Sequence, residues 1–235
     1  MPIVAGVDGC RGGWVVVRLN TRSRACERPV VLPAFADVLT LADPTPDVIT
    51  LDLPVGLLDA PVVGGRFCDR AARARLGHPR ASSVFSPPTR PCLGATSFHE
   101  LTGLSRQAFG ILSKIAEVDR SMTPAYQARV HEAHPELAFW ALRGRQATVF
   151  NKKTVEGRSE RVTALESAGH PAFLRLKAAL GAALACLPRR DVAPDDIVDA
   201  YALAWTALRI ATGQAERLPE SPPRDAKGLR MEIWY

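Results

Sequence analysis

The chain has 235 residues, of which 47% are hydrophobic, and this is enough for one large domain with a sizeable core. The 30 Lys and Arg outnumber the 24 Asp and Glu and give a net charge of +6. This charge permits a polyanionic partner such as nucleic acid but does not require one.

Several classes of protein are disfavoured. No stretch reaches the roughly 18 consecutive apolar residues that a membrane span needs, and residues 1–20 lack the pattern of a secretory signal. The five cysteines show no C-x-x-C spacing, which argues against a disulfide framework and against a structural zinc site. We therefore expect a cytoplasmic protein with no membrane partner, and the sequence leaves its oligomeric state open.

The first fifty residues show the pattern of an α/β fold. Three apolar runs predict strands, at residues 3–7, 14–19 and about 27–32. Gly12-Gly13 predicts a hairpin connection between the first two. Residues 35–41 then predict a short helix, and residues 48–51 form a near-continuous apolar run that is typical of an interior parallel strand. The predicted order is thus β-β-β-α-β.

The segment from about residue 56 to 128 differs from its surroundings, since it is rich in proline and its helices are short and arginine-rich. We interpret it as a helical insertion or cap within a single domain spanning residues 1–235. Its best helix candidate is 105–119, where apolar side chains recur at helical spacing. The rest of the chain predicts strands at 128–133 and 229–234, helices at 135–143 and 194–211, and a polar segment, 151–168, that starts in a loop.

Two aspartates directly follow apolar runs: Asp8 comes after residues 3–7, and Asp52 comes after residues 48–51. A charge at the end of a buried strand is costly unless something pairs with it, and open α/β sheets place their ligands at strand ends. Asp8 alone also fits an ordinary Asp-Gly turn. Because the pattern occurs twice, it favours a metal site built from both carboxylates.

Asp199 is the third candidate, because it lies a full turn inside the apolar helix predicted over residues 194–211. Asp196 has a simpler role at the positive end of that helix, but it is three residues from Asp199 and shares its face. Carboxylate oxygens are the ligands that Mg²⁺ prefers. The aspartates therefore predict a site for one or two Mg²⁺ or Mn²⁺ ions.

Glu132 and His134 would face the same side of a strand, which makes Glu132 a candidate accessory ligand beside the aspartates. The alternative is a polar strand end that leads into the helix beginning at Pro135.

Basic residues form two groups with alternative interpretations. The first group lies on one face of a predicted helix and either grips phosphates or forms a solvated face; it consists of Arg66, Arg70 and Arg73. The second group is weaker, and we interpret it as a solvated loop; it consists of Lys152, Lys153, Arg158 and Arg161.

Seven stretches, in order over nearly the whole chain, resemble the family called domain of unknown function 429. They are residues 6–14 (GVDGCRGGW), 52–57 (DLPVGL), 68–70 (CDR), 82–85 (SSVF), 114–119 (KIAEVD), 132–136 (EAHPE) and 199–200 (DA). The resemblance implies a predicted nuclease with a ribonuclease H-like fold, in which a central mixed sheet is flanked by helices. Residues 196–200 (DIVDA) are also similar to the D-x-x-D-A pattern in the last acidic helix of ribonuclease H-like Holliday-junction resolvases.

The resemblance implies metal-binding roles for Asp8 and Asp199, and a looser one for Asp52, where resolvases often have glutamate. The leading hypothesis is therefore metal-dependent hydrolysis of a phosphodiester bond by Asp8, Asp52 and Asp199. Further residues are assigned supporting roles: Asp196, Glu132 and Lys114 as accessory groups, and Arg11, Arg66 and Arg70 as phosphate-binding groups. Two alternatives stay open, namely an ATP-dependent phosphotransferase of the actin-hexokinase-like class and a non-catalytic binding module on the same fold.

Overall fold

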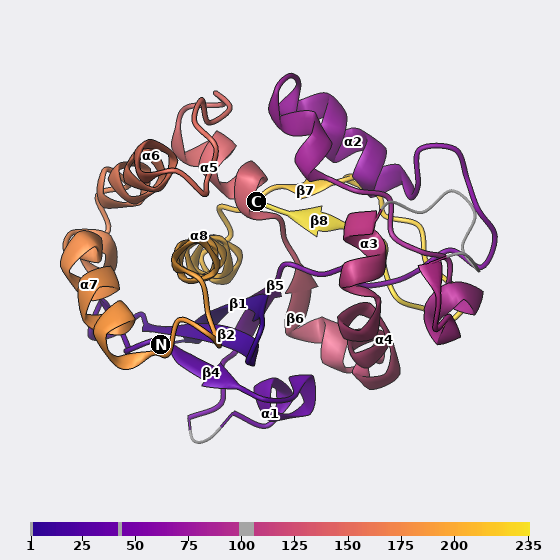
Figure 1. Ribbon diagram of the computed structural model, residues 1–235, viewed down its shortest axis with the longest axis horizontal. Coiled ribbons are helices and arrows are strands. Elements are labelled where there is room, and N and C mark those ends of the chain that lie inside the picture. Colours follow the sequence, from indigo (N-terminus) through magenta and orange to yellow (C-terminus); the bar gives the residue numbers. More distant parts are fainter. Residues whose placement is uncertain (1, 42–43, 99–105) are drawn as a thin grey trace.

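The computed structural model describes residues 2–41, 44–98 and 106–235. Its centre is a six-stranded mixed sheet in the order β3-β2-β1-β5-β6, with β4 also paired to β2 (Figure 1). β1 is antiparallel to β2 and parallel to β5, and β6 continues the parallel part. The strands are β1 (Ile3–Cys10), β2 (Gly13–Asn20), β3 (Ala25–Cys26), β4 (Val30–Leu32), β5 (Val48–Leu51) and β6 (Val130–Glu132). The predicted α/β class with a central mixed sheet is confirmed.

Strand boundaries differ from the prediction in two places. β1 continues past Val7 to Cys10, so Asp8 lies inside the strand, opposite Val15 of β2, and not in the turn. Of the strand predicted over about 27–32, only Val30–Leu32 is a strand, β4, and the short β3 precedes it at Ala25–Cys26. Pro29 lies between them, and proline cannot donate a ladder hydrogen bond.

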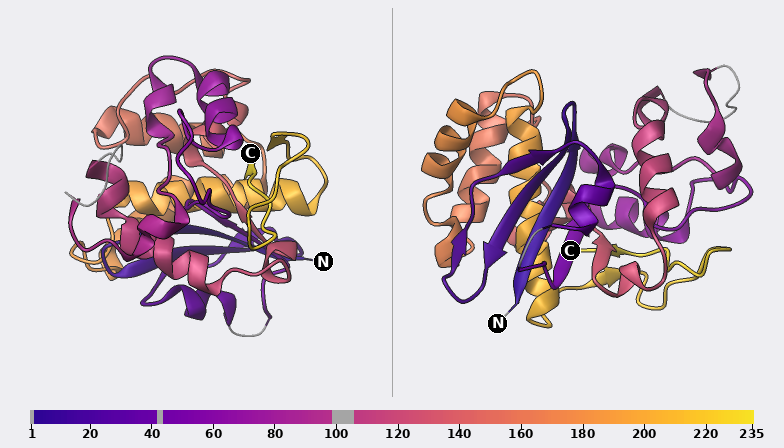
Figure 2. Two further views of the ribbon diagram at one scale, coloured as in Figure 1. Left: turned by 90° about the vertical axis from the view of Figure 1, so that its right-hand side faces the viewer. Right: turned by 90° about the horizontal axis from the view of Figure 1, so that it is seen from below.

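Helices cover both faces of the sheet (Figure 2). α8 lies directly on one face with α7, α6 and α5 outside it, and α1 and α4 pack on the other face. The helices are α1 (Phe35–Leu39), α2 (Phe67–Leu76), α3 (Arg106–Gly110), α4 (Leu112–Ser121), α5 (Pro135–Leu142), α6 (Val155–Glu166), α7 (Leu176–Cys186) and α8 (Pro194–Ala211). Within the described ranges, none of them is both long and apolar enough to cross a membrane.

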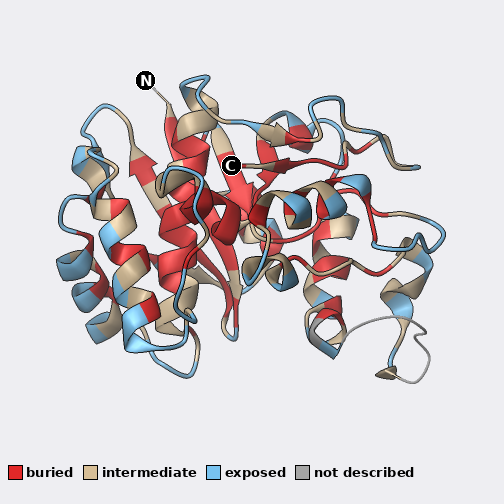
Figure 3. Cartoon of the chain, turned by 90° about the horizontal axis from the view of Figure 1, so that it is seen from above, coloured by how far each residue is buried: buried red, intermediate tan, exposed pale blue. Residues whose placement is uncertain are grey.

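The alternation of side chains along β1 separates two of the three hydrophobic clusters of the described residues, one on each face of the sheet. Val4 packs in the cluster formed with α8, whereas Ala5 and Val7 pack in the cluster formed with α1 and α4. Both clusters are buried, and exposed residues are concentrated on the outer helices and loops (Figure 3). Residues of β1 with even numbers therefore face α8.

Gly6 allows α8 to approach the sheet closely. A Cβ at this position would lie 2.1 Å from both the Ala200 carbonyl oxygen and the Ala204 amide nitrogen. On the neighbouring strand, the Thr50 hydroxyl donates to the Leu203 carbonyl at 2.7 Å. These contacts fix α8 against β1 and β5 without an intervening layer of side chains.

The insertion and the C-terminal segment lie together on one side of the sheet (Figure 1). The helix predicted over 105–119 is two helices, α3 and α4, separated at Ile111, and Ser105 lies outside the described residues. The strand predicted over 229–234 is confined to β8 (Ile233–Trp234), which pairs with β7 (Arg217–Leu218) in a separate sheet. Short 3₁₀ turns complete the chain, at Arg80–Ser83, Arg90–Gly94, Tyr126–Ala128 and Pro171–Phe173.

His131 on β6 gives a pH-dependent prediction. Burial lowers its pKa to about 4, and its ring packs against Trp234 with 5.5 Å between centroids. Between about pH 4 and 6.5 the unfolded chain binds a proton that folded His131 does not, so stability falls as the pH is lowered through this window. We expect this residue to contribute roughly 3 kcal/mol to the loss.

The free energy of unfolding, measured by urea denaturation from pH 7 to pH 4, checks this prediction. His131→Phe should flatten the pH dependence, whereas the same change at exposed His78 should not. Identical pH profiles for the two variants would show that His131 is not the group responsible.

Candidate active site

The register of the parallel strands brings Asp8 and Asp52 together. Gly6 of β1 pairs with Thr50 of β5, so the next residues on the same face are Asp8 and Asp52. The Asp52 amide donates to the Val7 carbonyl at 3.1 Å, which extends the ladder one residue beyond β5. Both aspartates therefore lie at the carboxyl ends of neighbouring parallel strands, on the face covered by α8.

α8 supplies the third carboxylate. Asp199 lies one turn before Leu203, which contacts Thr50, and its side chain is 1% exposed. Asp196 lies one turn earlier still, and its Oδ2 accepts a hydrogen bond from the Ala193 amide at 3.0 Å. Asp196 thus caps the helix, as its position in the sequence predicts.

These side chains line one cavity of about 830 Å³. Of the residues predicted from the sequence, six line it: Asp8, Arg11, Asp52, Lys114, Asp196 and Asp199. Other polar side chains join them there, namely Arg80, His134, Glu136, Asn151, Lys152, Lys153 and Asp195. The cavity thus combines an acidic floor with basic side chains from the surrounding loops.

Burial raises the pKa of all three carboxyl groups, and repulsion from neighbouring carboxylates adds to the rise. Burial raises the pKa of Asp8 well above its ordinary value, and the nearby charges of Asp52 and Asp199 raise it further. Burial also raises the pKa of Asp52, against the opposing charges of His134 and Lys152. The pKa of Asp199 rises to about 6 for the same reason, although Lys152 opposes the rise. Such groups gain from a cation that neutralises them.

The donor set fits a hard divalent ion. Among the described residues, Oδ1 of Asp199 is buried without a hydrogen-bond partner, and Asp8 Oδ1 accepts from the backbone amide of the adjacent Gly9 at 2.7 Å. Carboxylate oxygens with free lone pairs are the ligands that Mg²⁺ and Mn²⁺ take. As the side chains stand, no three His, Cys, Asp or Glu residues of the described ranges enclose a position for a metal ion. Asp199 is instead paired with Lys152.

The interpretation of the second basic group as a solvated loop is wrong for Lys152 and Arg161, which both form ion pairs with buried carboxylates. The Lys152 ammonium lies 2.6 Å from Asp199 Oδ2. Arg161, on α6, is 1% exposed and pairs with the buried Glu136 carboxylate. No local pattern in the sequence distinguishes these two residues from the exposed Lys153 beside them, because their partners lie far along the chain.

The structure does not bring Arg66, Arg70 or Glu132 to the cavity. Arg66 is buried and donates to Glu132 Oε2 at 2.8 Å and to Asp69 Oδ1 at 2.7 Å. Glu132 in turn accepts from the Val55 amide at 2.7 Å. Arg70 is exposed and donates to the Gly65 carbonyl. Arg66 and Glu132 therefore neutralise each other beneath the loop that follows β5.

Removing Arg66 should be costly. Arg66→Met leaves Asp69 and Glu132 buried without a counter-charge, and we expect a loss of about 3–5 kcal/mol in the free energy of unfolding. Urea denaturation measures the loss, and Arg70→Met is the matched control because that guanidinium is exposed. Equal losses for the two variants would mean that the buried pair contributes no more than a surface arginine.

Comparison with known proteins places the chain in one family. The family model described as Protein of unknown function (DUF429) matches residues 6–224. The chain belongs to this family. The match begins two residues before Asp8 and extends beyond α8, so it contains every carboxylate of the cavity. Searches of the curated proteins and of the solved structures gave no match.

Proposed function

We propose that this member of the DUF429 family is a metal-dependent phosphodiesterase that acts on nucleic acid, built on a ribonuclease H-like fold. One observation carries the proposal: the buried Asp8 of β1 and Asp199 of α8, with the partly buried Asp52 at the end of β5, line a single cavity with basic side chains beside them. The β-β-β-α-β order and the mixed sheet support the fold.

The aspartates would hold one or two Mg²⁺ or Mn²⁺ ions. Asp8 would be the carboxylate shared between two ions, because its strand pairs with β5, which ends next to Asp52, and is approached closely by α8, which carries Asp199. Asp52 and Asp199 would each bind one ion, with Asp196 as an accessory group. Such ions, when bound, activate the attacking water and stabilise the leaving oxygen.

The basic residues of the cavity would orient the phosphate. Arg11 and Lys153 are exposed and free to reach a phosphodiester. Lys114 is less free, because its ammonium donates to the Gly13 carbonyl at 2.6 Å and lies 4.5 Å from the centre of the Trp14 ring. Contacts from basic side chains to the phosphate backbone of a nucleic acid give affinity without sequence specificity.

Cleavage of labelled oligonucleotides tests the proposal. Purified protein is incubated with single-stranded, duplex and four-way-junction DNA and with RNA, in Mg²⁺, Mn²⁺ or a chelator. We expect cleavage of at least one substrate that the chelator abolishes. Absence of cleavage with either ion, or cleavage that the chelator leaves unchanged, would contradict the proposal.

The same samples separate the two alternatives. ATP binding measured by calorimetry, with ATP hydrolysis and no strand cleavage, would indicate a phosphotransferase. A melting temperature unaffected by either ion, together with no cleavage, would indicate a binding module.

A further inference from the structure

Lys152 and Asp199 form an ion pair of unequal members inside the cavity. The carboxylate belongs to a buried helix and is 1% exposed, whereas the lysine side chain is 38% exposed and comes from the loop before α6. Their charged atoms are 2.6 Å apart, and the other oxygen of Asp199 has no hydrogen-bond partner among the residues that the structure describes. Asp199 is therefore held in the buried helix with only one of its two oxygens paired, and the partly exposed Lys152 supplies that pairing.

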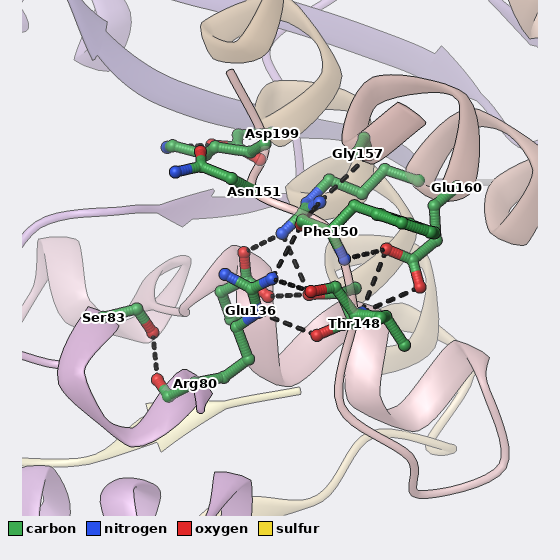
Figure 4. A network of polar contacts seen from close by, with 12 residues as sticks. Arg80, Ser83, Glu136, Thr148, Phe150, Asn151, Gly157, Glu160 and Asp199 are labelled. Atoms are coloured by element: carbon green, nitrogen blue, oxygen red, sulfur yellow. Dashed lines mark hydrogen bonds and ion pairs between the residues drawn. The ribbon is translucent and has the colours of Figure 1, made fainter. Parts of the chain in front are cut away.

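The loop that carries Lys152 is held in place by its backbone. Arg80 donates to the carbonyls of Thr148, Val149 and Phe150 at 2.7–2.8 Å. On the other side of the loop, Glu160 accepts from the Val149 and Phe150 amides at 2.9 and 3.0 Å. Figure 4 shows this network with Asn151 and Asp199 beside it.

Two further contacts fix the end of the loop nearest to Lys152. Arg161 donates to the Phe150 carbonyl at 3.1 Å. Gly157 of α6 lies so close that a Cβ there would be 1.9 Å from the Asn151 carbonyl oxygen. The fold thus places Lys152 at the cavity through contacts that do not involve its own side chain, while the partly exposed ammonium pairs with Asp199.

The ammonium and a divalent ion compete for the same carboxylate, that of Asp199. Lys152 opposes the rise in the pKa of Asp8, Asp52 and Asp199 alike, yet no three His, Cys, Asp or Glu side chains of the described part of the chain enclose a position for a metal ion as they stand. An ion bound between Asp8 and Asp199 would lie within a few ångströms of the ammonium, where two positive charges repel each other.

We propose that Lys152 is a tethered cation that occupies Asp199 until a divalent ion displaces it. The proposal rests on the metal-dependent function proposed above and extends it to the order of events in the cavity. While paired, Lys152 compensates the buried charge of Asp199. When displaced, the ammonium is left at the wall of the cavity, where it faces an incoming phosphate.

Calorimetric titration with Mn²⁺ at constant pH tests this proposal on wild type and on Lys152→Met. Removing the competing charge should tighten Mn²⁺ binding by about tenfold, which corresponds to about 1.4 kcal/mol. Lys153→Met is the matched control, because it removes the same charge from the same cavity. It should change the affinity by less than about threefold, since an exposed charge is screened by salt.

Lys152→Gln is a second variant that keeps the test valid if Lys152→Met does not fold. Its amide keeps a hydrogen-bond donor near Asp199 while removing the charge. It too should bind Mn²⁺ more tightly than wild type. Unchanged or weaker binding in both variants, with wild type binding Mn²⁺, would overturn the role of Lys152 alone. Tighter binding in both variants, with no cleavage by wild type, would support that role and remove the hydrolytic function. Failure of wild type and variants alike to bind Mn²⁺ would overturn both proposals.

Discussion

Asp8→Asn is expected to lower kcat/KM for metal-dependent cleavage by on the order of a thousandfold, because the substitution removes the charge of the carboxylate that interacts with both other ligands. Without metal, the same substitution should stabilise the fold by about 1–2 kcal/mol, since function of this kind costs stability. Asparagine keeps the oxygen that accepts the Gly9 amide hydrogen bond. The two effects therefore have opposite signs in one variant.

Cleavage rates and thermal melts with and without Mn²⁺ measure both effects. Asp195→Asn is the matched control, since Asp195 lines the same cavity but is partly exposed at the start of α8. We expect it to leave both quantities nearly unchanged. If Asp8→Asn kept a tenth or more of the wild-type rate, or destabilised the metal-free protein, Asp8 would be a structural residue.

Gly6→Ala is expected to destabilise the protein by about 4 kcal/mol or more, which is at the extreme of single-site effects. The added methyl group would lie 2.1 Å from two backbone atoms of α8, and backbone cannot move aside as a flexible side chain can. The helix would have to shift away from β1, carrying Asp199 away from Asp8. Stability and metal binding should therefore fall together.

Urea denaturation and Mn²⁺ titration of the variant check this result. Gly181→Ala is the control, because Gly181 lies on the exposed side of α7 and a Cβ there meets nothing within 4 Å. The control should gain about 0.5–1 kcal/mol from the better helix propensity of alanine. A loss at Gly6 no greater than about 1 kcal/mol would show that α8 can retreat at little cost.

The central elements were predictable because their signals are local. The apolar runs of β1 and β5 each lead into an aspartate, and the long apolar helix with its acidic start identifies α8. Parallel pairing of two such strands then brings Asp8 and Asp52 together by register alone. The packing role of Gly6 was not predictable, because its close approach to α8 depends on residues nearly two hundred positions away.

The burial of basic side chains was not predictable from the sequence, and the reason is physical. Arg66 and Arg161 are each 1% exposed on the side chain, whereas Arg70 and Lys153 are exposed. A long basic side chain is buried only where a distant carboxylate neutralises it, so its sequence neighbourhood does not reveal its burial. The same argument applies to Lys152, whose partner in α8 is 47 positions away.

The packing of β5 against α8 also determines how late in synthesis the cavity with its aspartates can form. Thr50 and Leu203, which join β5 to α8, are 153 positions apart. A ribosome adds roughly 5–20 residues per second, so α8 is synthesised on the order of ten seconds after β5. One face of the sheet stays uncovered until then. During that interval the apolar side chains that α8 covers in the folded protein stay exposed, and the set of aspartates is incomplete. Any hydrolytic activity is thereby withheld until most of the protein has been made.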